Sequence, residues 1–376
     1  MLTRIHAISG IRTQGSRGTG ITIRHPLDSD LDHVLSHTSD LWEQLRGRRI
    51  FITGATGFFG CWLLETFVWA NEQLRLNAEA TILTRNAQRL KERLPHLADR
   101  GLRVVVGDVR NFAFPNQEFS HIIHAATESS AELNGTQPEL MFDSIVEGTR
   151  HCLDLAARNK ASKFLFTSSG AVYGRQPANL THIPEDFTGG PDPTDTNSAY
   201  GEGKRAAELL CALAAKRNIT QPKIARCFAF VGPYMKLDAH FAIGNFIRDR
   251  IEDRPICVRG DGTAVRSYMY ASDLMIWLWT ILFRGESCRP YNVGSEQELS
   301  IAELAREVAG TGCTDKAASI QILGTPVPRA PVARYVPSTV RAQQELGLRC
   351  SVPLHEAIER TVEWNRLTTA KELQIQ

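Results

Sequence analysis

The chain has 376 residues, 43% hydrophobic and 22% charged, which is typical of a soluble globular protein with one large domain or a domain plus a smaller lobe. A formal net charge of +2 argues against nucleic acid as a partner, and no apolar run approaches the roughly 20 residues that a membrane span requires. The eight cysteines are scattered without a Cys-x-x-Cys pair, so we expect no metal site, no disulfide framework and a cytoplasmic protein.

The N-terminal 25 residues carry four arginines and no acidic residue, and they lack the apolar middle of a secretory signal. We expect residues 1–25 to form a disordered leader, with an organelle transit peptide or an upstream start codon as alternatives. Apolar residues recur at near-helical spacing from Leu31 to Leu45, which predicts a helical extension over residues 26–48.

The stretch from Phe51 to Gly60 predicts a strand, a sharp turn and the start of a helix. Gly54 would allow the tight turn, Gly57 would let a pyrophosphate approach the backbone, and Gly60 would let the helix lie close to the strand. The helix N-terminus would then offer free N–H groups to phosphate. The pattern therefore predicts dinucleotide binding, and an ordinary glycine-rich turn is the alternative.

Short apolar segments alternate with helical patterns through the first two thirds of the chain. Further strands are expected at Ala80–Thr84, Leu102–Val106, Phe119–His124, Lys163–Ser168 and Lys223–Phe228. Helices are expected from the glycine turn to Asn71 and at Ala87–Leu94, Glu139–Arg158 and Ser198–Lys216. This alternation predicts an α/β fold with a doubly wound parallel sheet of Rossmann type over residues 49–230.

The regular alternation of strands and helices ends after Gly232. Short strands are expected near Ile256 and Val265, and helices at Phe241–Glu252, Ser272–Phe283 and Ile301–Val308. We assign residues 231–376 to a smaller substrate-binding lobe that is interleaved with the first domain.

Tyr200 and Lys204 lie four residues apart and would share one face of a helix. An ammonium near a phenol favours the phenolate and lowers its pKa from about 10. Such a tyrosine can take a proton from a sugar hydroxyl while hydride leaves the same carbon. Ser169 ends the preceding strand and could share that proton. A surface Tyr-x-x-x-Lys pair and a strand-end turn are the structural alternatives.

These motifs together resemble the extended short-chain dehydrogenase/reductase family, in its NAD(P)-dependent nucleotide-sugar epimerase/dehydratase branch, over roughly Arg49 to Ala309. The resemblance implies a catalytic triad of Ser169, Tyr200 and Lys204. It implies that cofactor contacts come from the glycine turn, the third strand and the fourth strand, namely Gly54, Thr56, Gly57, Phe58, Phe59, Gly60, Asp108, Val109, Ala125, Ala126, Tyr200 and Lys204. It places the substrate at Ser169, Tyr173 and the diphosphate-binding Arg266.

Four positions depart from the family pattern in an informative way. Dehydratases of this family carry Asp and Glu after the catalytic hydroxyl, and nucleotide-glucuronate decarboxylases keep the glutamate, whereas this chain has Gly170 and Ala171. Neither residue transfers protons, which favours simple oxidation and reduction at C4. The carboxylates that could replace them are Glu128, Glu132, Glu185 and Asp186. We also expect unusual substrate contacts, because Ile145 and Ala229 stand where many relatives have Asn.

The end of the second strand lacks the acidic residue that usually binds the ribose 2′-hydroxyl of NAD. Arg85 stands there and could pair with a 2′-phosphate, so NADP is favoured over NAD. Stacking of Arg85 on adenine is the alternative.

We therefore expect a nucleotide-sugar 4-epimerase or 4-ketosugar reductase, with polysaccharide biosynthesis as a family-level expectation. A 4,6-dehydratase with relocated carboxylates is the enzymatic alternative, and a catalytically degenerate regulatory protein that only binds cofactor is the alternative of another class. The resemblance also implies a homodimer formed through the two long helices.

Overall fold

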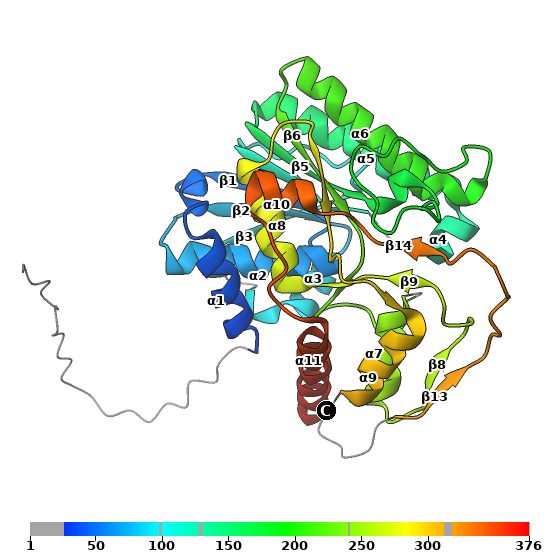
Figure 1. Cartoon of the computed structure of the whole chain (residues 1–376). Helices are drawn as coiled ribbons and strands as arrows, with labels where there is room; N and C mark the ends of the chain where they lie inside the picture. The colour runs from blue at the N-terminus through cyan, green and yellow to red at the C-terminus, as the bar shows by residue number, and fades with distance from the viewer. Residues whose placement is uncertain (1–25, 98–99, 128–130, 240, 312–317, 376) are drawn as a thin grey trace, which may run out of the picture.

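The computed structural model describes residues 26–97, 100–127, 131–239, 241–311 and 318–375, so the leader expected at 1–25 lies outside the described residues. The chain folds around a seven-stranded sheet that is flanked by helices on both faces, with a smaller lobe against one end (Figure 1). This confirms the doubly wound α/β fold that the sequence predicts.

The sheet has the strand order β11-β6-β5-β4-β1-β2-β3, and every adjacent pair is parallel. Its strands are β1 (Arg49–Thr53), β2 (Glu79–Thr84), β3 (Leu102–Val106), β4 (His121–His124), β5 (Lys163–Ser169), β6 (Gln221–Cys227) and β11 (Pro290–Val293). The chain winds outward from β1 in one direction to β3 and then in the other through β4, so the direction reverses between β1 and β4. Ligands of open α/β sheets bind at this switch point, beyond the carboxyl ends of the strands.

Alternate residues of the strands enter two separate cores. Ile50 and Ile52 pack with one set of helices, whereas Phe51 packs with the other. The first face carries α1 (Asp28–Thr38), η1 (Trp42–Leu45), α2 (Phe58–Gln73), α3 (Ala87–Arg93), η2 (Pro95–Leu97), α8 (Ala271–Arg284) and α10 (Val340–Leu346). The second face carries α5 (Pro138–Asn159) and α6 (Ala199–Lys216), and α4 (Ala131–Thr136), η3 (Gly170–Tyr173) and η4 (Thr196–Ser198) lie in the loops beside them.

The helical extension predicted for residues 26–48 is present and belongs to the first core. Trp42 is fully buried, and its ring centroid lies 4.5 Å from that of Trp279 in α8. Asp30 of α1 accepts a hydrogen bond from Tyr270 at 2.6 Å and pairs with Arg360. These contacts attach the extension to both the sheet layer and the C-terminal helix.

The smaller lobe has a core of its own. It is built from α7 (Ala242–Ile251), α9 (Ile301–Gly310), α11 (Leu354–Ile375), and the short strands β7 (Phe230–Val231), β8 (Ile256–Val258), β9 (Val265–Arg266), β10 (Met269–Tyr270), β12 (Leu299–Ser300), β13 (Ile320–Ile322) and β14 (Arg334–Tyr335). The helix predicted at Ser272–Phe283 exists as α8 but packs on the main sheet, because its tryptophans and leucines complete the first core. The chain thus returns to the sheet through α8 and β11 before it closes the lobe, as Figure 1 shows.

Candidate active site

The carboxyl ends of β1 and β4 are joined by a buried histidine. His124 Nδ1 lies 2.9 Å from the Thr53 hydroxyl, and its Nε2 lies 3.1 Å from the Thr149 hydroxyl of α5. The Ala126 N–H donates to the same Thr53 oxygen at 3.1 Å. Burial, with a smaller contribution from the Lys204 charge, lowers the pKa of His124 to about 3. This neutral ring therefore joins β1, β4 and α5 at the switch point.

Each of the three glycines in the turn would be affected differently by a side chain. Gly54 has a φ of +77°, and a Cβ there would come within 2.8 Å of the Ala126 nitrogen. A Cβ on Gly60 would come within 2.5 Å of the Ala55 Cα, so only glycine lets α2 lie this close to β1. Gly57 differs, because a Cβ there would meet only the Gly54 carbonyl oxygen, at 3.3 Å, and the residue is exposed.

The start of α2 has the features of an anion-binding cradle. Its N-cap residue, Gly57, makes no side-chain cap, and the first turn holds no acidic residue. The exposed Gly57 backbone and the open N–H groups suit a pyrophosphate. Thr56 is half-buried, and its carbonyl oxygen accepts a hydrogen bond from Arg93 at 2.8 Å. Phe58 and Phe59 are half-buried, and Phe59 packs edge-on against Phe230 at the lobe boundary. These residues fit a dinucleotide.

The carboxyl ends of β2 and β3 are rich in charge. Asp108 accepts hydrogen bonds from the Arg110 side chain at 2.9 Å, and this arginine, with Arg85 as a weaker influence, holds the pKa of Asp108 below its usual value. Arg85 is exposed at the end of β2. Val109 packs against Gly148 of α5, where a Cβ would come within 2.9 Å. The predicted adenosine-side residues therefore lie together.

The predicted lysine lies on α6, beside the carboxyl end of β5. Lys204 is 2% exposed, and its Nζ donates to the Thr167 carbonyl oxygen at 2.7 Å and to the Thr127 hydroxyl at 2.9 Å. The Nζ also lies 4.8 Å from the Phe166 ring centroid and 5.8 Å from that of Tyr200. Burial lowers the pKa of Lys204 to about 8.

Tyr200 and Ser169 lie near enough to each other for the Ser169 hydroxyl to influence the charge of the phenol. Burial raises the pKa of Tyr200 to about 12, and the Ser169 hydroxyl opposes the rise. The ammonium of Lys204 donates hydrogen bonds to Thr127 and Thr167.

Arg266 comes from the smaller lobe and lies beside Tyr335. It sits in β9, between β12 and β14, and is paired in register with Tyr335 of β14. Its Nη1 donates to the carbonyl oxygens of Val265 at 2.8 Å and Ala333 at 3.2 Å. The arginine is half-buried and faces the Tyr335 phenol closely enough to act on its charge.

The hydroxyl of the predicted substrate residue Tyr173 is engaged in hydrogen bonds within the protein. It is 2% exposed, and its hydroxyl donates to Asn292 at 2.7 Å and accepts from Arg226 at 2.9 Å. Burial raises the pKa of Tyr173 to about 12. Arg226 is held in turn by Glu208 at 2.7 Å. Tyr173 is thus part of a buried polar network beneath the site.

The replacement carboxylates are dispersed. Glu132 and Asp186 are exposed, and Glu128 lies outside the described residues. Glu185 is buried, but it accepts a hydrogen bond from the Asn292 backbone at 2.9 Å and lies 4.0 Å from Arg341. Among the described candidates, none is recorded as a partner of Ser169 or Tyr200.

Three residues near the site were missed by sequence reasoning. Thr127 follows the predicted Ala125-Ala126 pair directly, and its hydroxyl at a strand end was the available signal. Phe228 follows β6 directly and stacks on Tyr335 with 4.7 Å between ring centroids. Tyr335 also lies near enough to Ser169 to be influenced by its hydroxyl, and no local motif marks it.

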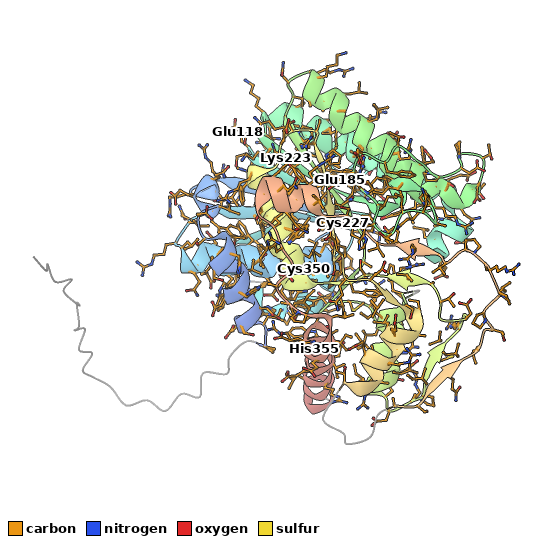
Figure 2. All side chains as sticks on the ribbon, viewed as in Figure 1. Glu118, Glu185, Lys223, Cys227, Cys350 and His355 are labelled. Carbon is orange, nitrogen blue, oxygen red and sulfur yellow. The ribbon has the colours of Figure 1, made fainter. Side chains whose placement is uncertain are left out.

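The site lies at one end of the sheet only. Cys227, labelled in Figure 2, ends β6 between the α5–α6 layer and the smaller lobe. A cavity of about 570 Å³ lies at the opposite end, lined by the residues that begin β1, β4 and β5 and by Glu118, which Figure 2 also labels. No helix among the described residues is long and apolar enough to cross a membrane.

Residues 50–294 match the family described as the NAD dependent epimerase/dehydratase family. The chain is 30% identical over 297 residues to UDP-glucuronic acid decarboxylase 6 of Arabidopsis thaliana, covering 79% of this chain and 81% of that protein. It is 28% identical over 323 residues to UDP-glucuronic acid decarboxylase 1 of Xenopus tropicalis, covering 85% and 72%.

Solved structures with the same fold include dTDP-glucose 4,6-dehydratase from Streptomyces venezuelae with NAD bound. Its TM-score is 0.72 at 23% identity, covering 86% of this chain and 98% of that one. The UDP-glucuronic acid 4-epimerase from Bacillus cereus in complex with NAD has a TM-score of 0.68 at 21% identity, covering 84% and 96%.

Proposed function

The chain belongs to the NAD dependent epimerase/dehydratase family, as its motifs indicate, and on that premise we propose that it oxidises C4 of a nucleotide-linked sugar and reduces it again. The observation that carries this proposal is the proximity of Ser169 to Tyr200 beside a buried Lys204, at the carboxyl end of the sheet. A proton acceptor, its hydroxyl partner and a positive charge then lie at the same end of the sheet as the dinucleotide cradle.

Each side chain has one task in this mechanism. Tyr200, as phenolate, takes the proton of the C4 hydroxyl, and Ser169 holds that hydroxyl and the phenol in line. Lys204 supplies positive charge beside them and is anchored by Thr127. Arg266 holds the diphosphate of the substrate from the smaller lobe. Bound NAD or NADP supplies the hydride acceptor and the positively charged ring that favours the phenolate.

The residues after Ser169 favour a 4-epimerase as the specific reaction. Gly170 and Ala171 carry no proton-transferring group, and the space beside Gly170 is filled by Phe228 and Tyr335, both 2.7 Å from a Cβ built there. A dehydratase would require carboxylates that the described candidates do not bring to Ser169. A reductase would consume one reduced cofactor in each turnover, whereas an epimerase would consume none.

We propose NADP rather than NAD as the preferred cofactor. The charge of Arg85 stands at the end of β2, where an acidic residue would bind the NAD ribose, and Arg85 is near enough to Asp108 to influence its charge. Its guanidinium suits a 2′-phosphate.

Decarboxylation of a nucleotide-linked uronic acid is the second candidate, and the 30% identity to a plant UDP-glucuronic acid decarboxylase favours it. Oxidation at C4 of such a sugar creates a β-keto acid, which loses carbon dioxide without an elimination step. The same Tyr200, Ser169 and Lys204 would carry the oxidation. Ala171 stands where the decarboxylases keep a glutamate, so the proton that returns to C5 would come from another group.

The deciding experiment incubates the full chain with a panel of nucleotide sugars, follows nicotinamide absorbance and identifies the products by mass spectrometry and NMR. A C4 epimer without net cofactor consumption supports the epimerase, and carbon dioxide release supports the decarboxylase. A 4-keto-6-deoxy product would establish the dehydratase. Cofactor binding without turnover of any sugar would instead support a regulatory protein. Tyr200→Phe is the control, and it should bind cofactor while losing turnover about a hundredfold or more.

We also propose that the protein forms a homodimer through α5 and α6. Phe142, Leu209 and Leu213 on these helices are large apolar side chains that remain 36–61% exposed in the single chain. Sedimentation of the purified chain, compared with Leu209→Glu, tests this assembly, which a monomeric wild type would exclude.

A further inference from the structure

One arginine joins the glycine turn to the first segment of the smaller lobe. Arg93, the last residue of α3, donates through Nη1 to the Thr56 carbonyl oxygen at 2.8 Å and through Nη2 to the Tyr234 carbonyl oxygen at 2.6 Å. Thr56 directly precedes Gly57, the N-cap residue of α2, and Tyr234 lies three residues after β7. A single planar guanidinium therefore holds two carbonyl oxygens from distant parts of the chain.

Tyr234 is held in a backbone conformation that residues with a side chain rarely adopt. Its φ is +69°, in the left-handed region, which costs free energy for a residue other than glycine. Its hydroxyl donates to the buried carboxylate of Glu65 in α2, and its ring packs edge-on against Trp364 of α11 with 4.9 Å between centroids. The Pro233 carbonyl oxygen accepts a hydrogen bond from the Trp62 indole at 2.9 Å. Contacts from α2, α3 and α11 thus fix this segment against its own strain.

The fixed segment continues the strand that leads toward the proposed substrate residue Arg266. β7 pairs in parallel with β10, with Phe230 opposite Met269, and Met269 lies three residues after Arg266. Phe59, in the first turn of α2, packs edge-on against Phe230 with 5.2 Å between ring centroids. The start of α2 therefore contacts the lobe through an aromatic pair, and Arg93 adds a directional bridge from the glycine turn.

The geometry of the bridge links the positions of the turn and the lobe. Hydrogen bonds weaken steeply as they bend, and the N–H groups of a guanidinium have fixed directions, so Arg93 keeps both bonds only at one relative position of Thr56 and Tyr234. A ligand that orders the turn therefore also orders the entry to the lobe. By thermodynamic linkage, a ligand that orders the lobe favours the ordered turn by the same free energy.

We propose that Arg93 is a positioning residue that couples the binding of the dinucleotide at the glycine turn to the binding of the nucleoside diphosphate of the substrate at the smaller lobe. The inference rests on the proposed function, because it takes the start of α2 and Arg266 as the two binding sites. Arg93 acts through its two carbonyl acceptors, and this role requires no contact with either ligand.

The test is a binding cycle on the full chain that requires no turnover. Calorimetric titration with NADP and with NAD gives the dinucleotide Kd in the absence of a nucleoside diphosphate and with saturating UDP or dTDP. In the wild type, we expect the nucleoside diphosphate to lower this Kd at least about fivefold. In Arg93→Met, which lacks both donors, the ratio of the two Kd values should fall to about one.

Arg93→Lys separates the bridge from the charge. A lysine at this position keeps the positive charge but lacks the forked donors, so we expect it to lose most of the ratio as well. Arg89→Met is the matched control, because Arg89 is exposed on the same helix, and it should keep the wild-type ratio. Thermal melts verify that each variant is folded, and Arg93→Lys carries the comparison if Arg93→Met does not fold.

The ratio distinguishes coupling from a purely structural role. A structural role would weaken each ligand equally, whether or not the other is bound, and would leave the ratio unchanged. A wild-type ratio of about one, or a wild-type ratio retained in both Arg93 variants, would overturn this inference, and turnover of a sugar in the panel would then still support the proposed function. A chain that binds no dinucleotide would overturn both.

Discussion

The Nζ of Lys204 donates a hydrogen bond to the Thr167 carbonyl oxygen at 2.7 Å and thereby ties the first turns of α6 to the end of β5. This contact places an ammonium group in the interior, with the side chain 2% exposed. Because burial disfavours the charged form, the pKa of Lys204 falls from 10.5 to about 8. The buried ammonium of Lys204 therefore lowers the free energy of unfolding at neutral pH.

Lys204→Met should change how the free energy of unfolding depends on pH. Between pH 8 and 10.5 the unfolded chain holds a proton on Lys204 that the folded chain has released, so the stability of the wild type rises with pH in this range. Relative to Lys204→Met, the wild type should gain up to about 3 kcal/mol across it. Urea unfolding at several pH values measures this difference, and parallel curves for the two proteins would contradict it.

Gly57→Ala and Gly60→Ala should separate cofactor binding from folding. A methyl group at position 60 overlaps the backbone of the turn, and we expect a loss of about 3 kcal/mol or failure to fold. A methyl group at position 57 meets only one carbonyl oxygen, so the melting temperature should be nearly unchanged while the affinity for the dinucleotide falls at least about tenfold. Thermal melts and calorimetric titration give both values. Full affinity for the dinucleotide in Gly57→Ala would contradict the proposal that the start of α2 binds the pyrophosphate.

Arg85→Ala should weaken NADP binding while leaving NAD binding unchanged. Loss of a charge-assisted bond to the 2′-phosphate should raise the Kd for NADP about tenfold. Arg103→Ala is the matched control, because Arg103 lies at the amino end of β3 and pairs with Glu79 at 3.3 Å. Fluorescence titration with both cofactors measures the effect. A wild type that prefers NAD would remove the argument for Arg85.

His124 should make the protein sensitive to acid. Its pKa falls from 6.5 to about 3 on folding, so the unfolded chain takes up a proton below pH 6.5 that the folded chain does not accept. Stability should therefore fall as the pH drops from 6.5, by about 3 kcal/mol at pH 4 from this residue. His124→Asn should flatten the decline, whereas substitution of the exposed His355, labelled in Figure 2, should not. If the free energy of unfolding falls equally with pH in the wild type, in His124→Asn and in the His355 variant, His124 is not the cause.

Much of the fold could be predicted because its signals are local. The glycine spacing from Gly54 to Gly60, the alternation of apolar strands and helices, and the spacing from Tyr200 to Lys204 are each read within a few residues. The strands from β1 to β6 and the helices α2, α5 and α6 lie where they were predicted, within a few residues at their ends. The assignment of α8 failed because an apolar helix does not indicate which core it completes.

The sequence by itself determined the family, the parallel sheet and the identity of the candidate triad, since backbone turns and helix faces follow from neighbouring residues. Only the tertiary structure decided that the Lys204 ammonium binds Thr127 and Thr167, that Tyr173 is hydrogen-bonded to Arg226 and Asn292, and that Tyr335 pairs with Arg266 and stacks on Phe228. These relationships join segments far apart in the chain, and they depend on how two cores pack rather than on any local pattern.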